Sequence, residues 1–220
     1  MLYVVATPIG NLKDMTLRAI ETLKLADFII AENPGHSAKL LRHYEIGNKK
    51  IFQFAEHNEH RALPTLIANL KSQTGALITD AGTPGISDPG FRLVRACVEN
   101  GIKIAPIPGP SAAIAALSAS GLATDRFLFL GFAPRTEIKL TRIISLGKAV
   151  ESTVIFYESP FRIIKTLQFI AKHFPDCHAV VARELTKVYE EFLRGAPSEI
   201  LEQLTKNRAK GEFAVLISFK

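Results

Sequence analysis

Residues 80–90, Asp-Ala-Gly-Thr-Pro-Gly-Ile-Ser-Asp-Pro-Gly, place three glycines and two prolines between a strand pattern and a helix pattern. The apolar run 76–79 before them is typical of a buried strand, and the run 91–98 after them has helical spacing. Glycine permits positive φ and close approach of a ligand, whereas proline stiffens the loop. In an open α/β sheet, ligands bind beside the carboxyl ends of the strands, where such a loop lies. The sequence therefore predicts an α/β fold with a binding loop here, and a tight connecting turn is the alternative.

Two further segments repeat this arrangement. In the first, an apolar run at 2–5 is followed by a Gly/Pro turn at 6–11 and a helical pattern at 16–25. In the second, the apolar run is at 102–105, the turn at 106–112 and the helical pattern at 111–117. Ser111 is a suitable N-cap, and free amides at such a helix start can hold a polar or anionic group. None of the three turns matches the G-x-G-x-x-G or P-loop pattern, so no dinucleotide fingerprint or Walker site is predicted.

The second half of the chain also alternates between strand and helix patterns. Strands are expected at 127–130, 153–157, 179–182 and 213–217, and helices near 136–144, 160–173 and 198–206. Residues 190–195 suggest an extra strand or turn, which would give mixed strand directions. The segment 121–124 is the expected domain boundary, giving α/β domains over 1–120 and 121–220. Two such domains would meet at a cleft, the usual place for a ligand.

Composition limits the class of protein. The chain has 220 residues, of which 47% are hydrophobic, and no apolar run is long enough to span a bilayer. Its N-terminus enters a strand directly, without a signal-peptide pattern. Cys97 and Cys177 form neither a disulfide framework nor a metal site, and the six histidines are scattered, so no metal is expected. These features favour a cytoplasmic protein without a membrane partner.

The net charge of +6 favours polyanionic partners. Several basic residues gather in one stretch: Arg135, Lys139, Arg142 and Lys148. Solvated helix faces and loops are the more common explanation of such a cluster.

Six segments, spread in order over almost the whole chain, carry a resemblance: 2–12, 80–90, 106–121 with 124–127, 156–160, 182–187 and 210–212. Together they resemble the ribosomal RNA small subunit methyltransferase I family, within the tetrapyrrole methylase superfamily. The resemblance implies two α/β domains of the tetrapyrrole methylase type with S-adenosylmethionine in the cleft between them. It also implies a homodimer that methylates the ribose 2′-hydroxyl of a cytidine in small-subunit ribosomal RNA, free or in the assembled subunit.

The resemblance also implies roles for individual residues. The cofactor-binding residues would be Gly10, Gly82, Thr83, Pro84, Ile86, Ser111, Ala112, Tyr157, Ala182 and Phe213, with Ala214 as the alternative to Phe213 beside the adenine. The catalytic candidates are Glu184, Lys187 and His57, because methylation of a hydroxyl needs a proton acceptor and histidine exchanges protons near neutral pH. The structural alternatives are an interface ion pair for Arg183 and Glu184, and a helix cap for His57.

Three places depart from the family pattern. Asn33-Pro34-Gly35 replaces a segment that usually carries an acid and an arginine, and Ala55 and Phe161 stand where histidine is common. These departures affect substrate contacts and rate more than fold. They leave open a methyltransferase of the same fold acting on a tetrapyrrole or corrin intermediate, and a cofactor-binding protein without turnover. A phosphate-ligand enzyme that uses the Pro108-Gly109-Pro110 loop is a further alternative.

Overall fold

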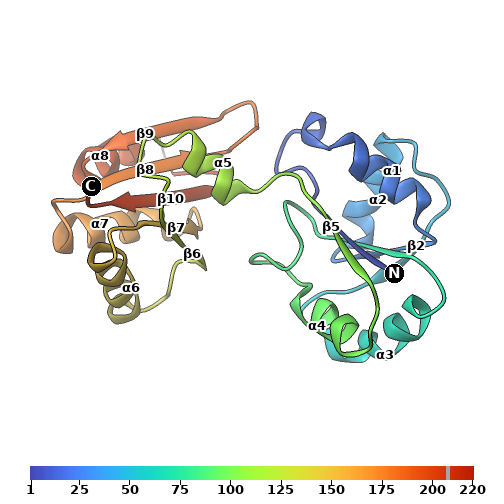
Figure 1. Cartoon of the computed structure of the whole chain (residues 1–220). Coiled ribbons are helices and arrows are strands. Elements are labelled where there is room, and N and C mark those ends of the chain that lie inside the picture. Colours follow the sequence, from blue (N-terminus) through green and yellow to red (C-terminus); the bar gives the residue numbers. More distant parts are fainter. Residues whose placement is uncertain (207–208) are drawn as a thin grey trace. The chain divides into compact units, whose positions relative to one another are not determined.

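The computed structural model describes residues 1–206 and 209–220 and divides into two compact units, Met1–Ser111 and Ala112–Lys220 (Figure 1). The expected boundary at 120/121 lies nine residues later than this division. The difference is helix α5 (Ala112–Ser118), which packs against strands of the second unit. In the described part of the chain, no helix combines the length and the apolar character that crossing a membrane requires.

The first unit contains a parallel five-stranded sheet with the order β3-β2-β4-β1-β5. Its strands are β1 (Leu2–Val5), β2 (Phe28–Ala31), β3 (Lys50–Gln53), β4 (Gly75–Ile78) and β5 (Ile104–Ile107). Its helices are α1 (Leu17–Leu25), α2 (Pro34–His43), α3 (Glu59–Leu70) and α4 (Phe91–Glu99), with a 3-10 turn at Leu12–Asp14. Because all the strands are parallel, the loops that follow them emerge at one edge.

Helices cover both faces of this sheet (Figure 1). On one face, Leu23 of α1 and Leu41 of α2 pack with Ile29 of the sheet. On the other face, Leu66 of α3 and Cys97 of α4 pack with strand residues. The central strands β2 and β4 are buried along their whole length, as is typical of a parallel sheet that is covered on both sides.

The second unit contains a mixed sheet with the order β6-β7-β10-β8-β9. Its strands are β6 (Phe127–Phe132), β7 (Thr153–Glu158), β8 (His178–Arg183), β9 (Glu191–Gly195) and β10 (Phe213–Ser218). Strands β6 and β7 are parallel, whereas β10 is antiparallel to β7 and β8, and β9 is antiparallel to β8. The mixed directions and the extra strand predicted near 190–195 are therefore confirmed.

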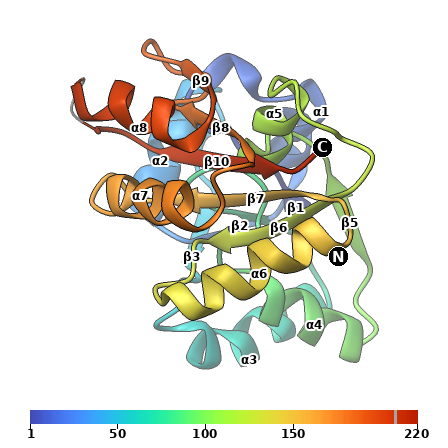
Figure 2. The same cartoon turned by 90° about the vertical axis from the view of Figure 1, so that its left-hand side faces the viewer.

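Three helices lie side by side over one face of this second sheet (Figure 2). They are α6 (Glu137–Ala149), α7 (Ile163–His173) and α8 (Pro197–Lys206). The apolar core on this side contains Ile144 of α6, Leu167 of α7 and Ile200 of α8. Helix α5 packs against β7 and β10.

Candidate active site

The three turns singled out in the sequence follow β1, β4 and β5, which are neighbours in the first sheet. Hydrogen bonds join them directly. The Thr7 amide donates to the Gly82 carbonyl at 2.8 Å, and the Gly82 amide donates to the Thr7 carbonyl at 3.0 Å. The Thr83 hydroxyl donates to the Pro110 carbonyl at 3.1 Å. The predicted loops therefore form one connected structure at the carboxyl edge of the sheet.

The loop after β4 depends on glycine at two points. Gly82 has φ +79°, in the left-handed region that disfavours residues with a Cβ. Gly90 has φ +143°, and a Cβ there would lie 3.0 Å from the Gly85 amide nitrogen. Among the predicted cofactor residues of this unit, Gly82 and Pro84 are buried, Thr83 and Ser111 are half-buried, and Gly10 and Ile86 are exposed. The loop therefore presents both backbone and side chains to a ligand.

A group of carboxylates lies beside this loop. The Asp80 amide donates to the Glu32 carboxylate at 3.4 Å, and the Thr79 hydroxyl donates to Asp88 at 3.4 Å. Asp80 Oδ1 is buried without a hydrogen-bond partner among the described residues. Burial raises the pKa of Asp88 to about 6, and the Glu32 carboxylate adds to the shift. Burial also raises the pKa of Glu32, although the Asp80 amide opposes it.

We expect Asp88→Asn to stabilise the protein at pH 7.5 by about 1 kcal/mol, a value that allows for screening at a half-buried site. The raised pKa of Asp88 means that ionisation costs the folded state free energy. This free-energy cost is absent below pH 3.8, the pKa of the Asp88 carboxyl in the unfolded chain. It grows as the pH rises and is complete above about pH 6, the pKa of the carboxyl in the folded protein. Urea unfolding of both proteins at pH 4 and pH 7.5 measures the difference. An equal difference at the two pH values would contradict the assignment.

The segment Asn33-Pro34-Gly35, which departs from the family pattern, forms the start of α2. The Asn33 side chain accepts hydrogen bonds from the amides of Gly35 at 3.1 Å and His36 at 3.2 Å. Pro34 occupies the first helical turn, where its missing donor costs nothing. The substituted residues therefore form a well-capped helix directly after Glu32.

In the second unit, two of the predicted cofactor residues share one row of the sheet. Ala214 of β10 pairs with Tyr157 of β7 and with Ala182 of β8, so these three side chains point to the same face. Phe213 is one position away, and its side chain is buried in the core under α6, α7 and α8. Of the two residues predicted beside the adenine, Ala214 therefore has its side chain on the face of Tyr157 and Ala182, and strand alternation turns the Phe213 side chain to the opposite face.

The hydroxyl of Tyr157 also meets the start of α5. It accepts a hydrogen bond from the Ala113 amide at 3.1 Å, which is one of the amides predicted to be free for a ligand. The rings of Phe129 and Phe132 pack edge-on against Tyr157, with centroids 5.0 and 5.8 Å away. Tyr157 is therefore fixed from several sides.

Glu184 and Lys187 form an ion pair after β8. The Lys187 ammonium donates to Glu184 at 2.9 Å and to Glu212 at 3.0 Å, and the Glu212 amide donates to Glu184 at 3.0 Å. The Lys187 bond lowers the pKa of Glu184. Burial lowers the pKa of Lys187, but its bonds to the two carboxylates outweigh burial, and the net shift is upward. Both groups therefore stay charged at neutral pH.

The backbone around this pair is constrained. Glu184 and Thr186 have φ of +51° and +64°, which is uncommon for residues other than glycine. Gly211 has φ +101°, and a Cβ there would lie 2.6 Å from Glu184 Cγ. Such conformations persist where the surrounding structure fixes them, often at functional sites.

His57 belongs to the first unit and lies in the turn before α3. Its side chain is exposed and has no hydrogen bond to any described residue. The neighbouring Glu59 is buried and pairs with Arg92 of α4 at 3.0 Å, which links the two helices. Within the second unit, the structure brings the catalytic candidates Glu184 and Lys187 together.

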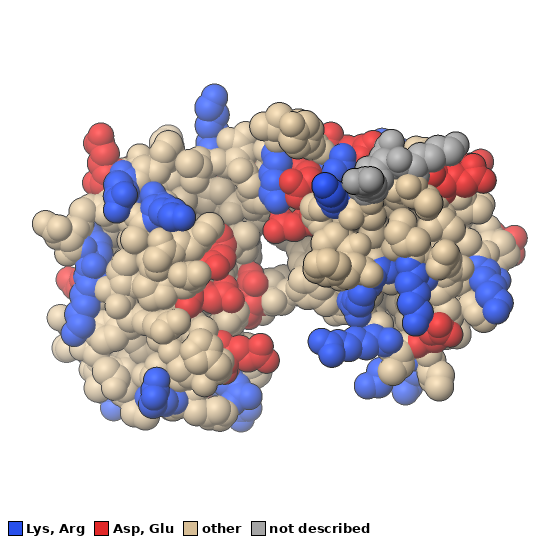
Figure 3. Space-filling view, turned by 180° about the vertical axis from the view of Figure 1, so that it is seen from behind, with Lys and Arg blue, Asp and Glu red and all other residues tan. Residues whose placement is uncertain are grey.

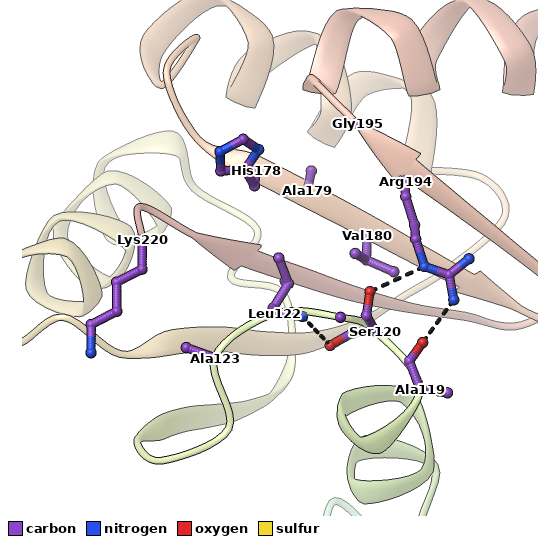
Figure 4. A pocket seen from close by; sticks show the side chains of 11 residues that line it. Ala119, Ser120, Leu122, Ala123, His178, Ala179, Val180, Arg194, Gly195 and Lys220 are labelled. Atoms are coloured by element: carbon purple, nitrogen blue, oxygen red, sulfur yellow. Dashed lines mark hydrogen bonds between the residues drawn. The ribbon is translucent and has the colours of Figure 1, made fainter.

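A cavity of about 650 Å³ lies elsewhere in the second unit (Figure 4). Arg194 lines it and donates to the carbonyls of Ser120 at 3.1 Å and Ala119 at 2.7 Å. These contacts place a cation just after α5, where the helix dipole favours positive charge. Because its guanidinium is already occupied by carbonyls, Arg194 serves the fold in this cavity.

Residues of the metal-ligating types do not assemble into a candidate metal site in the described part of the chain. Both cysteines are free and buried. Burial raises the pKa of Cys97 and of Cys177 to about 11, so neither thiol ionises readily near neutral pH.

The comparison with known families decides between the possible classes of α/β protein. The model of the tetrapyrrole (corrin/porphyrin) methylases matches residues 1–201. The chain belongs to this family. The resemblance noted in the sequence and the predicted fold class are thereby confirmed.

Two curated relatives of this tetrapyrrole methylase are close in sequence. One from Synechocystis sp. is 46% identical over 220 residues, which cover 99% of this chain and 78% of the relative. One from Hydrogenobaculum sp. is 44% identical over 223 residues, which cover 99% of this chain and 95% of the relative. Both are described as ribosomal RNA small subunit methyltransferase I.

Solved structures of other enzymes show the same fold. Diphthine synthase matches with a TM-score of 0.78 at 16% identity, over 99% of this chain and 89% of the other. Cobalt precorrin-4 methyltransferase matches with a TM-score of 0.70 at 17% identity, over 99% of this chain and 94% of the other. At such identities the likeness extends to the fold alone.

Proposed function

We propose that this chain is an S-adenosylmethionine-dependent methyltransferase that modifies the 2′-hydroxyl of a cytidine in small-subunit ribosomal RNA. The observation that carries the proposal is the 44 to 46% identity, over nearly the whole chain, to proteins described as ribosomal RNA small subunit methyltransferase I. Two solved enzymes of this fold, diphthine synthase and cobalt precorrin-4 methyltransferase, are far less similar, at 16% and 17% identity. The proposal includes a cytoplasmic homodimer that acts on the RNA or on the assembled subunit.

The charge of the first unit supports S-adenosylmethionine as the cofactor. The cofactor carries a sulfonium and an ammonium cation. Asp80 Oδ1 is buried without a partner among the described residues, and burial raises the pKa of Asp88 to about 6. A bound cation would lower the cost of ionising these carboxyls. The same loop contains Gly82, whose left-handed backbone disfavours any residue with a Cβ.

We assign two sets of residues to this cofactor. The first unit contributes the loops after β1, β4 and β5, with Gly10, Gly82, Thr83, Pro84, Ile86 and Ser111. The second unit contributes Ala112, Tyr157, Ala182 and Ala214, with Phe213 limited to its backbone.

S-adenosylmethionine, when bound, supplies an electrophilic methyl group. A ribose hydroxyl is a weak acid, so the chain must hold its oxygen in line with that methyl group and accept its proton. His57 is our proposed proton acceptor, because its imidazole is exposed and makes no bond to a described residue. Glu184 and Lys187 are charged and mutually paired, which suits them to orient the substrate or cofactor.

In the test, the protein and S-adenosylmethionine are incubated in three separate reactions. One contains small ribosomal subunits, one contains a porphyrinogen-type tetrapyrrole, and one contains no methyl acceptor. We expect methyl transfer to the subunits only, and we expect His57→Ala to lower kcat by about 100-fold or more, in line with a lost general base. His178→Ala, an exposed histidine of β8, is the matched control. Transfer to the tetrapyrrole would overturn the substrate, and cofactor binding without transfer would indicate a protein that has lost turnover.

A further inference from the structure

The positive charge of the second unit is concentrated in one stretch. Residues 133–175 hold seven Lys and Arg against three Asp and Glu, whereas the rest of 112–220 holds eight of each. One of the three acids, Glu158, is buried and already paired with Arg162. In Figure 3, Lys and Arg gather over the lower part of this unit, where α6 lies in Figure 1. This region is therefore the strongly basic surface of the unit.

Three cations lie at the start of α6. Lys139 and Arg142 are three residues apart, which places them on one face of the helix, and Arg135 directly precedes its N-cap, Thr136. All three side chains are exposed and make no hydrogen bond or ion pair with a described residue. Leu140 and Ile144 are buried, which fixes the orientation of the helix. The row of cations thus faces solvent with its charge unneutralised.

An aromatic side chain stands beside this row. Phe161, in the turn before α7, is 96% exposed, so packing within the chain does not explain it. The next residue, Arg162, donates to the Ala133 carbonyl at 3.1 Å and pairs with Glu158 at 2.6 Å. These bonds fix the Phe161 turn to the segment that leads into Arg135 and α6. The ring is therefore displayed from a rigid support.

We propose that this surface, formed by Arg135, Lys139, Arg142 and Phe161, docks a single-stranded segment of the substrate RNA. The cations would contact successive phosphates, and Phe161 would stack on an unpaired base. A basic groove or row combined with an exposed ring is the arrangement by which proteins hold single strands. The inference rests on the proposed function, because it takes ribosomal RNA as the partner. Beyond the proposed function, the inference specifies the surface on which the RNA lies and the side chains that hold it.

The test measures binding of a single-stranded RNA covering the methylated region over a range of salt concentrations, together with methylation kinetics of the subunit. For the triple variant Arg135→Gln, Lys139→Gln, Arg142→Gln, we expect the slope of log K against log salt to fall by about 2, at about 0.7 per lost phosphate contact. We expect KM for the subunit to rise about tenfold or more while affinity for S-adenosylmethionine is unchanged. Phe161→Ala should weaken RNA binding about tenfold, and Phe161→Trp should retain it.

Matched controls separate this surface from general basicity. Lys24→Gln, Lys71→Gln and Lys103→Gln together remove the same charge from exposed positions that precede β2, β4 and β5. Val188→Ala removes an apolar side chain that is 93% exposed. Equal effects of the two triple variants, or a Phe161→Ala effect no larger than that of Val188→Ala, would overturn the docking surface while the methyltransferase proposal stands. A wild-type protein that neither binds nor methylates RNA would overturn both.

Discussion

Gly82→Val is expected to weaken S-adenosylmethionine binding by more than about tenfold, equivalent to about 1.4 kcal/mol. Gly82 has φ +79°, and its backbone exchanges two hydrogen bonds with Thr7. A left-handed conformation costs an ordinary residue about 1–2 kcal/mol, and a β-branched residue is still less suited to it. A Cβ would lie 3.5 Å from Ile9 and 3.8 Å from the Pro110 carbonyl, so the strain is in the backbone rather than in a clash. Relief of that strain would move the loop that we assign to the cofactor.

Gly101→Val is the matched control for this prediction. Gly101 has φ +66° and open space around its missing Cβ, and it follows α4 at the opposite end of that helix from the loop. The same substitution therefore introduces comparable strain away from the cofactor loops. Calorimetric titration with S-adenosylmethionine measures both variants. If they lose affinity equally, or if Gly82→Val binds as well as the wild type, the cofactor assignment of this loop fails.

Arg162→Met is expected to destabilise the second unit by about 3 kcal/mol or more. Arg162 pairs with Glu158 at 2.6 Å, and the side chain of Glu158 is only 1% exposed. Removing the guanidinium leaves a buried carboxylate whose remaining hydrogen-bond partners among the described residues are the Ser159 amide, at 2.8 Å, and the Thr166 hydroxyl, at 2.7 Å. The variant also loses the bond to the Ala133 carbonyl. Urea unfolding followed by circular dichroism measures the loss.

Arg95→Met provides the comparison for the buried pair. Arg95 pairs with Glu99 at the same spacing of four residues, but the side chain of Glu99 is 59% exposed. Exposed pairs of this kind contribute about 0.5 kcal/mol or less. Adding Glu158→Gln to Arg162→Met should restore part of the stability, because it removes the unpaired charge. Equal losses in the two single variants would show that burial of Glu158 does not govern the effect.

The loops at the carboxyl edge of the first sheet were predictable because their sequence signals are local. Each of the loops after β1, β4 and β5 has a Gly/Pro turn between an apolar run and a helix pattern. The strand order β4-β1-β5, which makes the three loops neighbours, could not be predicted from the sequence. Strands β2 and β3 and helix α2 were not predicted. Helix α2 begins with Pro34-Gly35, which is typical of a loop, and only the Asn33 cap marks it as a helix start.

The parts of the site that escaped prediction depend on tertiary burial. Asp80 and Asp88 stood in the segment first singled out, yet only the folded structure shows that Asp88 is desolvated and lies near Glu32. Similarly, alternation along β10 predicts that Phe213 and Ala214 face opposite ways, but the side covered by α6, α7 and α8 decides which of them is in the core. The burial of a carboxyl and the face of a strand that is covered can be assigned only when the sheet and its covering helices are known.

The most direct measurement of the central claim is the position of the transferred methyl group. The protein is incubated with methyl-labelled S-adenosylmethionine and small ribosomal subunits that lack ribose methylation, and the RNA is digested and analysed by mass spectrometry. We predict label on the 2′-oxygen of a single cytidine. Label on a base, label spread over many nucleotides, or no label from a protein that binds the cofactor would contradict the proposed function.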